Sequence, residues 1–219
     1  MTTENQSPAP DEPSGSADKR QQILDAATRV FLQRGYGETS MDRVAQESGA
    51  ARRTLYNQFK SKEALFEAMV ERVWSSFPVF DITRDEASLS DPRAGLLRLG
   101  QAVADFWVPA EAVAFLRMVI AEGQRFPALT KTFLDLGKGP AMAAVADYLA
   151  ALAQRQLVDI ADPKMAARQF LGLIDEPLLW VRVVGIDETY TPAQRRVIVE
   201  TAVDMFLGFY RRPSLIATQ

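Results

Sequence analysis

The sequence predicts an all-α fold, in which an N-terminal three-helix helix-turn-helix domain is joined by a fourth helix to a larger helical domain. Three observations predict this fold. Apolar residues recur at helical spacing, three and four positions apart, along most of the chain. Capping residues, glycines and prolines separate these segments. No segment keeps the alternation of apolar and polar residues that is typical of a half-buried strand.

The composition of the 219-residue chain is that of a folded globular protein, with 47% hydrophobic and 24% charged residues. The net charge is -3, so any contact with DNA must come from a local basic patch. The absence of Cys and His excludes disulfide bonds, Cys/His zinc sites and catalysis by a Cys nucleophile or a His base. We expect no cofactor, no metal site and no enzymatic activity, because no acidic cluster supports a remaining candidate such as Glu122 with Asp105.

Both ends of the chain are expected to be tails. Residues 1–17 are rich in Pro, Ser and acid, which predicts disorder, and residues 214–219 form a short C-terminal tail. The N-terminal segment lacks the basic and apolar regions of a secretory signal. No apolar run approaches the roughly 20 residues that span a bilayer. We therefore expect a cytoplasmic protein that does not associate with membranes.

Residues 18–60 predict three short helices. The first begins at Asp18, which can cap its N-terminus, and ends at Gly35, where glycine permits a left-handed turn. The second follows the capping segment 39–42 and ends at Gly49.

The third short helix is expected over residues 52–59, with Leu55 and Phe59 four positions apart on its inward face. Ser61 then caps a fourth helix that continues to Trp74. Two short helices separated by a glycine turn fit a helix-turn-helix, with the third helix as its second member.

The larger domain, residues 61–213, contains the fourth helix and six more that prolines and glycines separate. The segment 75–92 is expected to be a connector. The six helices are predicted near residues 93–106, 110–125, 128–136, 140–156, 163–184 and 193–211.

Positive charge is concentrated between Ser48 and Lys62, a segment that also holds Arg52, Arg53 and Lys60 and no acid. Arg52 and Arg53 lie in the first turn of the third helix, and Lys62 lies in the first turn of the fourth. Cations there oppose the helix dipole, and a bound phosphate would relieve the conflict. An ordinary solvated face is the alternative, which the glycine-bounded helix pair disfavours.

Tyr56 lies at the margin of the inward face that Leu55 and Phe59 define. It is either a core aromatic residue or an exposed ring whose hydroxyl meets a phosphate. Its position about 100° from Leu55 around the helix favours a partly exposed hydroxyl.

Residues 18–74 contain a pattern that combines core, turn and phosphate positions: Thr39-Ser40-Met41-Asp42-Arg43-Val44-Ala45, Ser48-Gly49 and Thr54-Leu55-Tyr56-Asn57-Gln58-Phe59-Lys60-Ser61-Lys62-Glu63-Ala64-Leu65. This pattern resembles the DNA-binding domain of the tetracycline-repressor (TetR) family. Further along, Ile120-Ala121-Glu122 with Arg125-Phe126-Pro127-Ala128-Leu129, and Asp162-Pro163 with Ala166-Ala167-Arg168-Gln169-Phe170, resemble the C-terminal domain of AefR-type members.

The resemblance implies a homodimeric repressor that binds DNA through the helix-turn-helix. At the matching positions, the residues implied to face the major groove are Arg52, Arg53, Thr54 and Asn57. Those implied to contact phosphates are Thr39, Ser40, Tyr56 and Lys62. One departure is Ala51, which stands where the recognition helix of the family usually has a Ser or Thr cap. Without a capping side chain the helix loses about 1 kcal/mol of stabilisation.

The last two predicted helices are apolar nearly all round, so each has two faces to bury. One face can cover its own core and the other a second copy, which predicts a symmetric dimer through a four-helix bundle. A central core helix in a monomer is the alternative, and Pro177 should kink or break the first of the two helices. The residues expected at the interface are Leu171, Ile174, Leu178, Val181, Val199, Val203, Phe206 and Tyr210.

Apolar residues of the larger domain are candidates for the wall of an effector cavity, although such residues more often form plain core. Glu122 would orient a cationic or hydrogen-bond-donating ligand there, and its alternative role is a surface ion pair with Arg125. The expected cavity residues are Phe77, Phe106, Trp107, Phe115, Met118, Val119, Glu122 and Tyr148.

Together these features predict a sequence-specific repressor that a small molecule releases from a palindromic operator. Its partners would be double-stranded operator DNA, a second copy of the chain and an unknown, largely apolar effector. An activator of the same family is one alternative, because only the position of the operator relative to the promoter separates the two. A helical ligand-binding module that does not read DNA is another, because Ala51 weakens the cap of the recognition helix.

Overall fold

The computed structural model describes residues 13–186 and 188–210, and every regular element in these ranges is helical, as the sequence predicts. The chain divides into two compact units, Met1–Met69 and Val70–Gln219. The division falls within α4 (Lys62–Ser75), whereas the sequence analysis placed it just before this helix. Within the described ranges, no helix is both long and apolar enough to cross a membrane.

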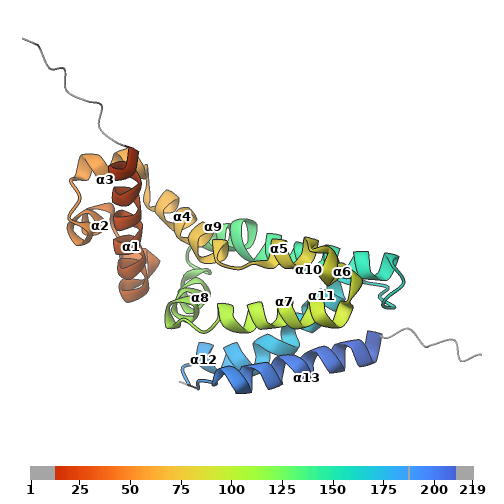
Figure 1. Ribbon diagram of the computed structural model, residues 1–219. Helices are drawn as coiled ribbons and strands as arrows, with labels where there is room; N and C mark the ends of the chain where they lie inside the picture. Colours follow the sequence, from red (N-terminus) through yellow and green to blue (C-terminus); the bar gives the residue numbers. More distant parts are fainter. Residues whose placement is uncertain (1–12, 187, 211–219) are drawn as a thin grey trace, which may run out of the picture. The chain divides into compact units, whose positions relative to one another are not determined.

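The N-terminal unit consists of α1 (Pro13–Glu38), α2 (Met41–Ser48), α3 (Arg52–Gln58) and the first part of α4 (Figure 1). Because α1 already begins at Pro13, the predicted start and cap at Asp18 are wrong, and residues 13–17 are helical rather than part of a tail. The rest of the expected N-terminal tail, and the expected C-terminal tail, lie outside the described residues. Gly35 has φ 81° and ψ 169°, which interrupts the helical backbone where the sequence predicts the end of the first helix.

The caps of the N-terminal unit follow the predicted pattern. The Ser40 Oγ accepts a hydrogen bond from the backbone N–H of Arg43 at 3.3 Å, and Gly49 ends α2 in the left-handed region with φ 62°. The Ser61 Oγ accepts from the N–H of Ala64 at 3.2 Å at the start of α4. Ala51 precedes α3 without a side-chain cap.

The C-terminal unit contains the remaining helices. Two short ones occupy the segment that was expected to be a connector: α5 (Val79–Arg84) and α6 (Glu86–Ser90). They are too short to show a helical period in the sequence. The other helices lie within or close to the predicted ranges: α7 (Pro92–Phe106), α8 (Ala110–Glu122), α9 (Pro127–Phe133), α10 (Gly139–Gln154), α11 (Pro163–Asp175), α12 (Val181–Val183) and α13 (Pro192–Tyr210). Both α11 and α12 fall in the range 163–184, which was predicted as one helix.

Two π-helical turns interrupt the regular helices of this unit. The first, η1 (Leu134–Lys138), joins α9 to α10, and the second, η2 (Glu176–Trp180), joins α11 to α12. Pro177 lies in η2, so the predicted disturbance at this proline takes the form of a π-turn instead of a break. Proline has no N–H for an α-helical hydrogen bond, and a π-turn accommodates that loss while the chain stays helical.

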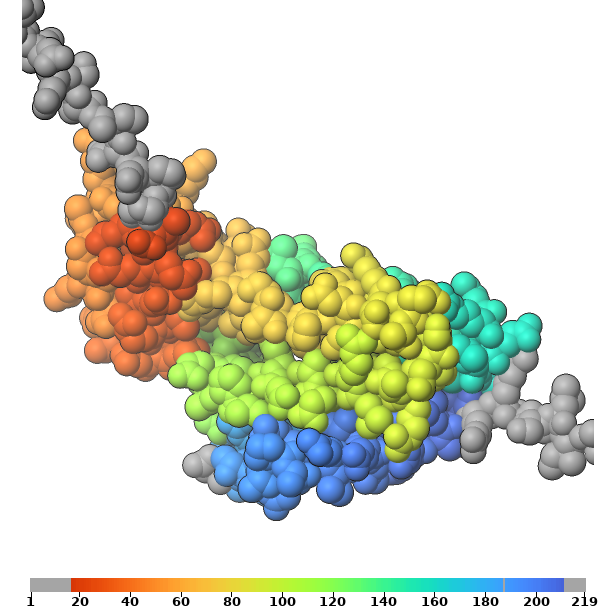
Figure 2. Space-filling model, in the orientation of Figure 1, coloured from red at the N-terminus to blue at the C-terminus, as the bar shows by residue number. Residues whose placement is uncertain are grey.

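In the C-terminal unit, α7 packs against α11 and α13, and α10 packs against α5 and α11 (Figure 1). Figure 2 shows the side chains of α7 in direct contact with those of the final helix, α13. Two glycines allow α7 to approach its neighbouring helices closely. A Cβ on Gly100 would lie 2.7 Å from Val199 Cγ1, and a Cβ on Gly95 would lie 2.1 Å from the hydroxyl of Tyr148.

The close approach at Gly95 predicts that Gly95→Ala destabilises the protein by about 1–3 kcal/mol, because the added methyl group collides with Tyr148 and with the Ser88 carbonyl. Thermal unfolding followed by circular dichroism measures the loss. The matched control is Gly172→Ala in α11, where a Cβ meets nothing within 4 Å and helix propensity should add about 0.5–1 kcal/mol. Equal melting temperatures for the two variants would contradict the packing described for α7.

Candidate nucleic-acid interface and effector cavity

The outer face of α3 carries most of the polar residues that the sequence assigns to base contacts. Arg52, Arg53 and Asn57 are exposed, while Thr54 is half-buried. Tyr56 is 47% exposed, which excludes its alternative as a core residue. The inward face is as expected, because Leu55 and Phe59 are buried.

Arg52 is engaged by an acidic residue of the preceding helix. Its guanidinium group donates hydrogen bonds to the carboxylate of Asp42 in the first turn of α2. The hydrogen bond and the attraction between the two charges lower the pKa of Asp42 and raise that of Arg52. Both side chains are exposed, so another anion could compete with Asp42 for this guanidinium group. Local spacing in the sequence does not reveal this pair, because ten positions separate the two residues along the chain.

The four residues implied to contact phosphates have different surroundings. Ser40 and Tyr56 are exposed. Thr39 is only 3% exposed, and its hydroxyl donates to the Gly35 carbonyl at 2.8 Å, so it holds the turn between α1 and α2. Lys62 is half-buried, and its Nζ donates to the Tyr36 carbonyl at 2.9 Å.

Tyr36, near the end of α1, packs this helix against α4. Its ring stacks on Phe31 of α1 with 5.7 Å between ring centroids, and meets Phe66 of α4 edge-on at the same separation. Its hydroxyl donates to Glu63 Oε1 at 3.1 Å, and Lys62 Nζ lies 4.3 Å from the ring centroid. Burial and the neighbouring Glu63 raise the pKa of Tyr36, so its hydroxyl remains a donor at neutral pH.

A cavity of about 470 Å³ lies in the C-terminal unit. All three tryptophans of the chain, Trp74, Trp107 and Trp180, contribute to its wall. The Nε1 of Trp74 is buried and has no hydrogen-bond partner within the described part of the chain. Further apolar lining residues are Phe77, Phe106, Phe133, Met142, Leu171 and Leu179.

The structure separates the predicted cavity residues into two groups. Phe77, Phe106 and Trp107 line the cavity. The others do not: Phe115, Met118, Val119 and Tyr148 are buried in the packed interior, and Glu122 also lies outside the cavity wall. The difference arises because helical periodicity identifies the inward face of a helix and not where that face leaves a void.

The residues predicted for the dimer interface are mostly inside the core of their own chain. Five are buried there: Ile174, Leu178, Val199, Val203 and Phe206. Of the other three, Leu171 borders the cavity, Val181 is half-buried, and Tyr210 is half-buried with its hydroxyl donating to Gln169. A different set of apolar side chains on α13 is exposed: Val197, Met205 and Phe209.

Three charged side chains border the cavity, one acidic and two basic. The acid is Asp175, at the end of α11, and its Oδ1 accepts a hydrogen bond from Trp107 Nε1 at 3.0 Å. Burial raises the pKa of Asp175 to about 6, against the opposing effects of Lys138 and the Trp107 hydrogen bond. The bases are Lys138 and Arg168, both exposed. No local pattern in the sequence marks Asp175 as a cavity residue.

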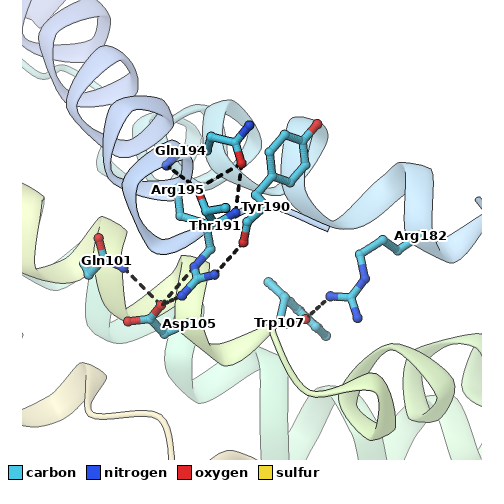
Figure 3. Close-up of polar contacts among 8 residues, drawn as sticks. All are labelled: Gln101, Asp105, Trp107, Arg182, Tyr190, Thr191, Gln194 and Arg195. Carbon is cyan, nitrogen blue, oxygen red and sulfur yellow. Dashed lines mark hydrogen bonds and ion pairs between the residues drawn. The ribbon is translucent and has the colours of Figure 1, made fainter. Parts of the chain in front are cut away.

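Two arginines from the last third of the chain, Arg182 and Arg195, hold the backbone around Trp107 through polar contacts (Figure 3). The guanidinium group of Arg182 donates to the carbonyl oxygens of Trp107 and Val108. Arg195 bridges α7 and the start of α13, because it donates to Asp105 Oδ1 at 3.2 Å and to the Tyr190 carbonyl at 2.8 Å. These contacts fix the segment from which the Trp107 indole reaches Asp175.

The described residues contain no group of three or more Asp and Glu side chains that could hold a metal ion.

The comparisons with known proteins agree with this division. A family model described as the C-terminal domain of AefR-like transcriptional repressors matches residues 94–212, and a model of the tetR family of bacterial regulatory proteins matches residues 23–69. The curated transcriptional activator FasR of Mycolicibacterium smegmatis is 40% identical over 55 residues, which is 25% of each chain. The chain spans about a quarter of the length of the first curated relatives it matches.

Two solved structures are similar over most of the chain. A TetR-family transcriptional regulator from Mesorhizobium loti is 27% identical with a TM-score of 0.76, over 90% of this chain and 98% of that one. The flavonoid-responsive regulator FrrA is 27% identical with a TM-score of 0.71, over 90% of this chain and 100% of that one. These proteins are transcriptional regulators and not enzymes. Since the AefR-like model covers more than half of the chain and the other model falls on the helix-turn-helix, the chain belongs to the TetR family of bacterial transcriptional regulators.

Proposed function

We propose that the protein is a homodimeric, cytoplasmic repressor that binds a palindromic operator and leaves it when a small, largely apolar molecule occupies the C-terminal cavity. The observation that carries the DNA-binding part is the exposed face of α3, where Arg52, Arg53, Tyr56 and Asn57 point away from a buried Leu55. Family membership supports the same conclusion.

The side chains of α3 are of the types that read base edges. Arg donates two parallel hydrogen bonds to guanine, and Asn makes a similar pair with adenine. Ser40 and Tyr56 are exposed and fit phosphate contacts, which fix the protein on the duplex. Thr39 and Lys62 make intrachain hydrogen bonds through their polar groups, so we assign them to holding the turn and the start of α4.

Release by an effector requires that the cavity and the DNA-binding unit be coupled. The helix α4 provides a continuous covalent path, since it begins at Lys62 in the N-terminal unit and its Trp74 borders the cavity. Linkage then requires operator DNA to weaken effector binding by the same factor by which the effector weakens operator binding. The name of the flavonoid-responsive structural relative supports a small-molecule effector for a chain of this fold.

For the dimer, we propose contact through the exposed side of α13 rather than through the buried residues expected from the sequence. Val197, Met205 and Phe209 lie at spacings of eight and four residues, which places them along one face of the helix. Phe209 is 79% exposed, which is costly in water for a side chain of this size. A dimer that binds a palindromic operator needs its two recognition helices about 34–36 Å apart.

Activation remains the second candidate, because one relative is a transcriptional activator and both kinds of regulator use the same interface. Mapping the operator against the promoter separates them, since a repressor site overlaps the promoter and an activator site lies upstream. A module without DNA reading is the third candidate, and the missing cap at Ala51 is its only support.

We predict that Arg52→Ala weakens specific operator binding by about 1–3 kcal/mol, because it removes a base contact. Asp42→Asn is the matched variant, and it should keep or strengthen binding because it removes the acid that competes for Arg52. Fluorescence anisotropy with the DNA flanking the gene, beside a scrambled duplex and over a salt series, measures both. Binding that is selective and weakened by salt is expected for the unaltered protein.

Two results would contradict this assignment. Equal affinity of the unaltered protein for the flanking and scrambled duplexes, followed by no selected site in a genome-wide binding screen, would exclude DNA reading. Unchanged operator affinity in Arg52→Ala would exclude the role of that residue alone.

We also predict that Phe209→Lys converts a dimer into a monomer, since a charge buried in an apolar interface must be desolvated. Sedimentation velocity measures the mass at a fixed protein concentration. The control is Ile120→Lys on α8, an exposed apolar residue outside the proposed interface, which should leave the dimer intact. A Phe209→Lys protein that sediments like the unaltered one would move the interface elsewhere.

A further inference from the structure

The cavity combines aromatic walls with a small number of charged groups. Its wall includes three tryptophans and several phenylalanines, which suit a flat aromatic ligand better than a flexible aliphatic chain. Its volume of about 470 Å³ is within the usual range for small-molecule sites. The aromatic side chains come from α4, α7, α9 and η2 and from the residues that follow α4 and α7, so a ligand inside would contact several helices of the unit.

The charges restrict what that ligand carries. Lys138 and Arg168 stand against a single acid, Asp175, so the wall is net positive when all three are ionised. A permanently cationic ligand would have to lose its water in an aromatic cavity that offers it one carboxylate, and this desolvation cost can exceed the attraction. Lys138 and Arg168 are exposed and are hydrated without a ligand, so an anionic ligand would gain little from them.

Asp175 is the polar group for which a ligand would matter most. Among the described residues, the Trp107 indole donates to its Oδ1, which leaves Oδ2 to accept from another donor. The guanidinium group of Arg182 donates to the backbone carbonyl of Trp107 (Figure 3) and so holds the residue that donates to the carboxylate. Asp175 also directly precedes η2, while Lys138 ends η1, so both π-turns border the cavity. Such turns occur often at functional sites.

We propose that the effector is an uncharged planar aromatic compound with a hydroxyl group, and that this hydroxyl donates a hydrogen bond to Asp175 while the rings stack among the tryptophans. This inference rests on the proposed effector function of the cavity and names the chemical class of the ligand. A hydrogen bond from a phenol to a carboxylate is charge-assisted and is stronger than one between neutral groups. A methyl ether of the same size fills the cavity equally well but has no proton to donate.

Four biphenyl probes test the proposal on the full-length protein by isothermal titration calorimetry: 4-phenylphenol, 4-methoxybiphenyl, biphenyl-4-carboxylate and 4-phenylbenzylammonium. We expect 4-phenylphenol to bind about tenfold more tightly than 4-methoxybiphenyl, the size expected for one charge-assisted hydrogen bond. Because every tryptophan of the chain borders the cavity, quenching of the intrinsic fluorescence reports that the probes occupy it.

The decisive variant is Asp175→Asn, which keeps the shape and an oxygen for Trp107 but removes the charge and places an N–H₂ donor toward the ligand. The preference for 4-phenylphenol over 4-methoxybiphenyl should fall to less than about twofold, because the amide N–H₂ can donate to the oxygen of either probe. Arg168→Gln is the control that alters another charged residue of the wall, and it should retain the tenfold preference. Circular dichroism melting shows whether both variants are folded. If Asp175→Asn does not fold, the preference of the unaltered protein for the phenol over the ether tests the proposal.

Several outcomes would overturn the proposal. They are equal binding of phenol and ether by the unaltered protein, a preference that survives in Asp175→Asn, tighter binding of the carboxylate or the ammonium than of the phenol, and no binding of any probe at its solubility limit. Operator release is measured separately by anisotropy. Probes that bind with the expected preference but leave the operator complex intact would support the ligand class and contradict release as the function of the cavity.

Discussion

The DNA-binding unit depends on the packing of Tyr36 between α1 and α4. Its ring is held between Phe31 and Phe66, its hydroxyl donates to Glu63, and its carbonyl accepts from Lys62. The helices α2 and α3 are too short to be stable alone, so they take their positions from the two longer helices that Tyr36 joins. The exposed face of α3 can therefore be rigid although α3 has no side-chain cap.

Local signals in the sequence were sufficient for much of this unit. Ser40, Gly49 and Ser61 cap or end helices through contacts within a few residues, and the four-residue spacing of Leu55 and Phe59 determines which face of α3 is buried. These features need no information about distant parts of the chain. The predicted start of α1 was wrong, because the helix begins at Pro13, before the capping signal at Asp18, in the segment that contains Pro and Ser.

The candidate sites were predicted less well because they depend on contacts between distant segments. Thr39 and Lys62 match the family pattern, but their polar groups donate hydrogen bonds to the backbone carbonyls of Gly35 and Tyr36. In the C-terminal unit, the periodicity identified Val203 and Phe206 as residues to bury without saying what would cover them. Asp175 meets Trp107 across 68 positions of the chain, and no spacing rule relates the two.

The ion pair between Arg52 and Asp42 also affects how salt dependence is to be read in this protein. An arginine that is already neutralised by a carboxylate in the free state exchanges one anionic partner for another when it meets DNA. The number of ions released on binding is then smaller than the number of cationic side chains at the interface. A slope of binding against salt concentration would therefore undercount the DNA contacts of this chain, by up to one for each recognition helix. Counterion release and contact number are separate quantities wherever a recognition helix supplies its own counterion.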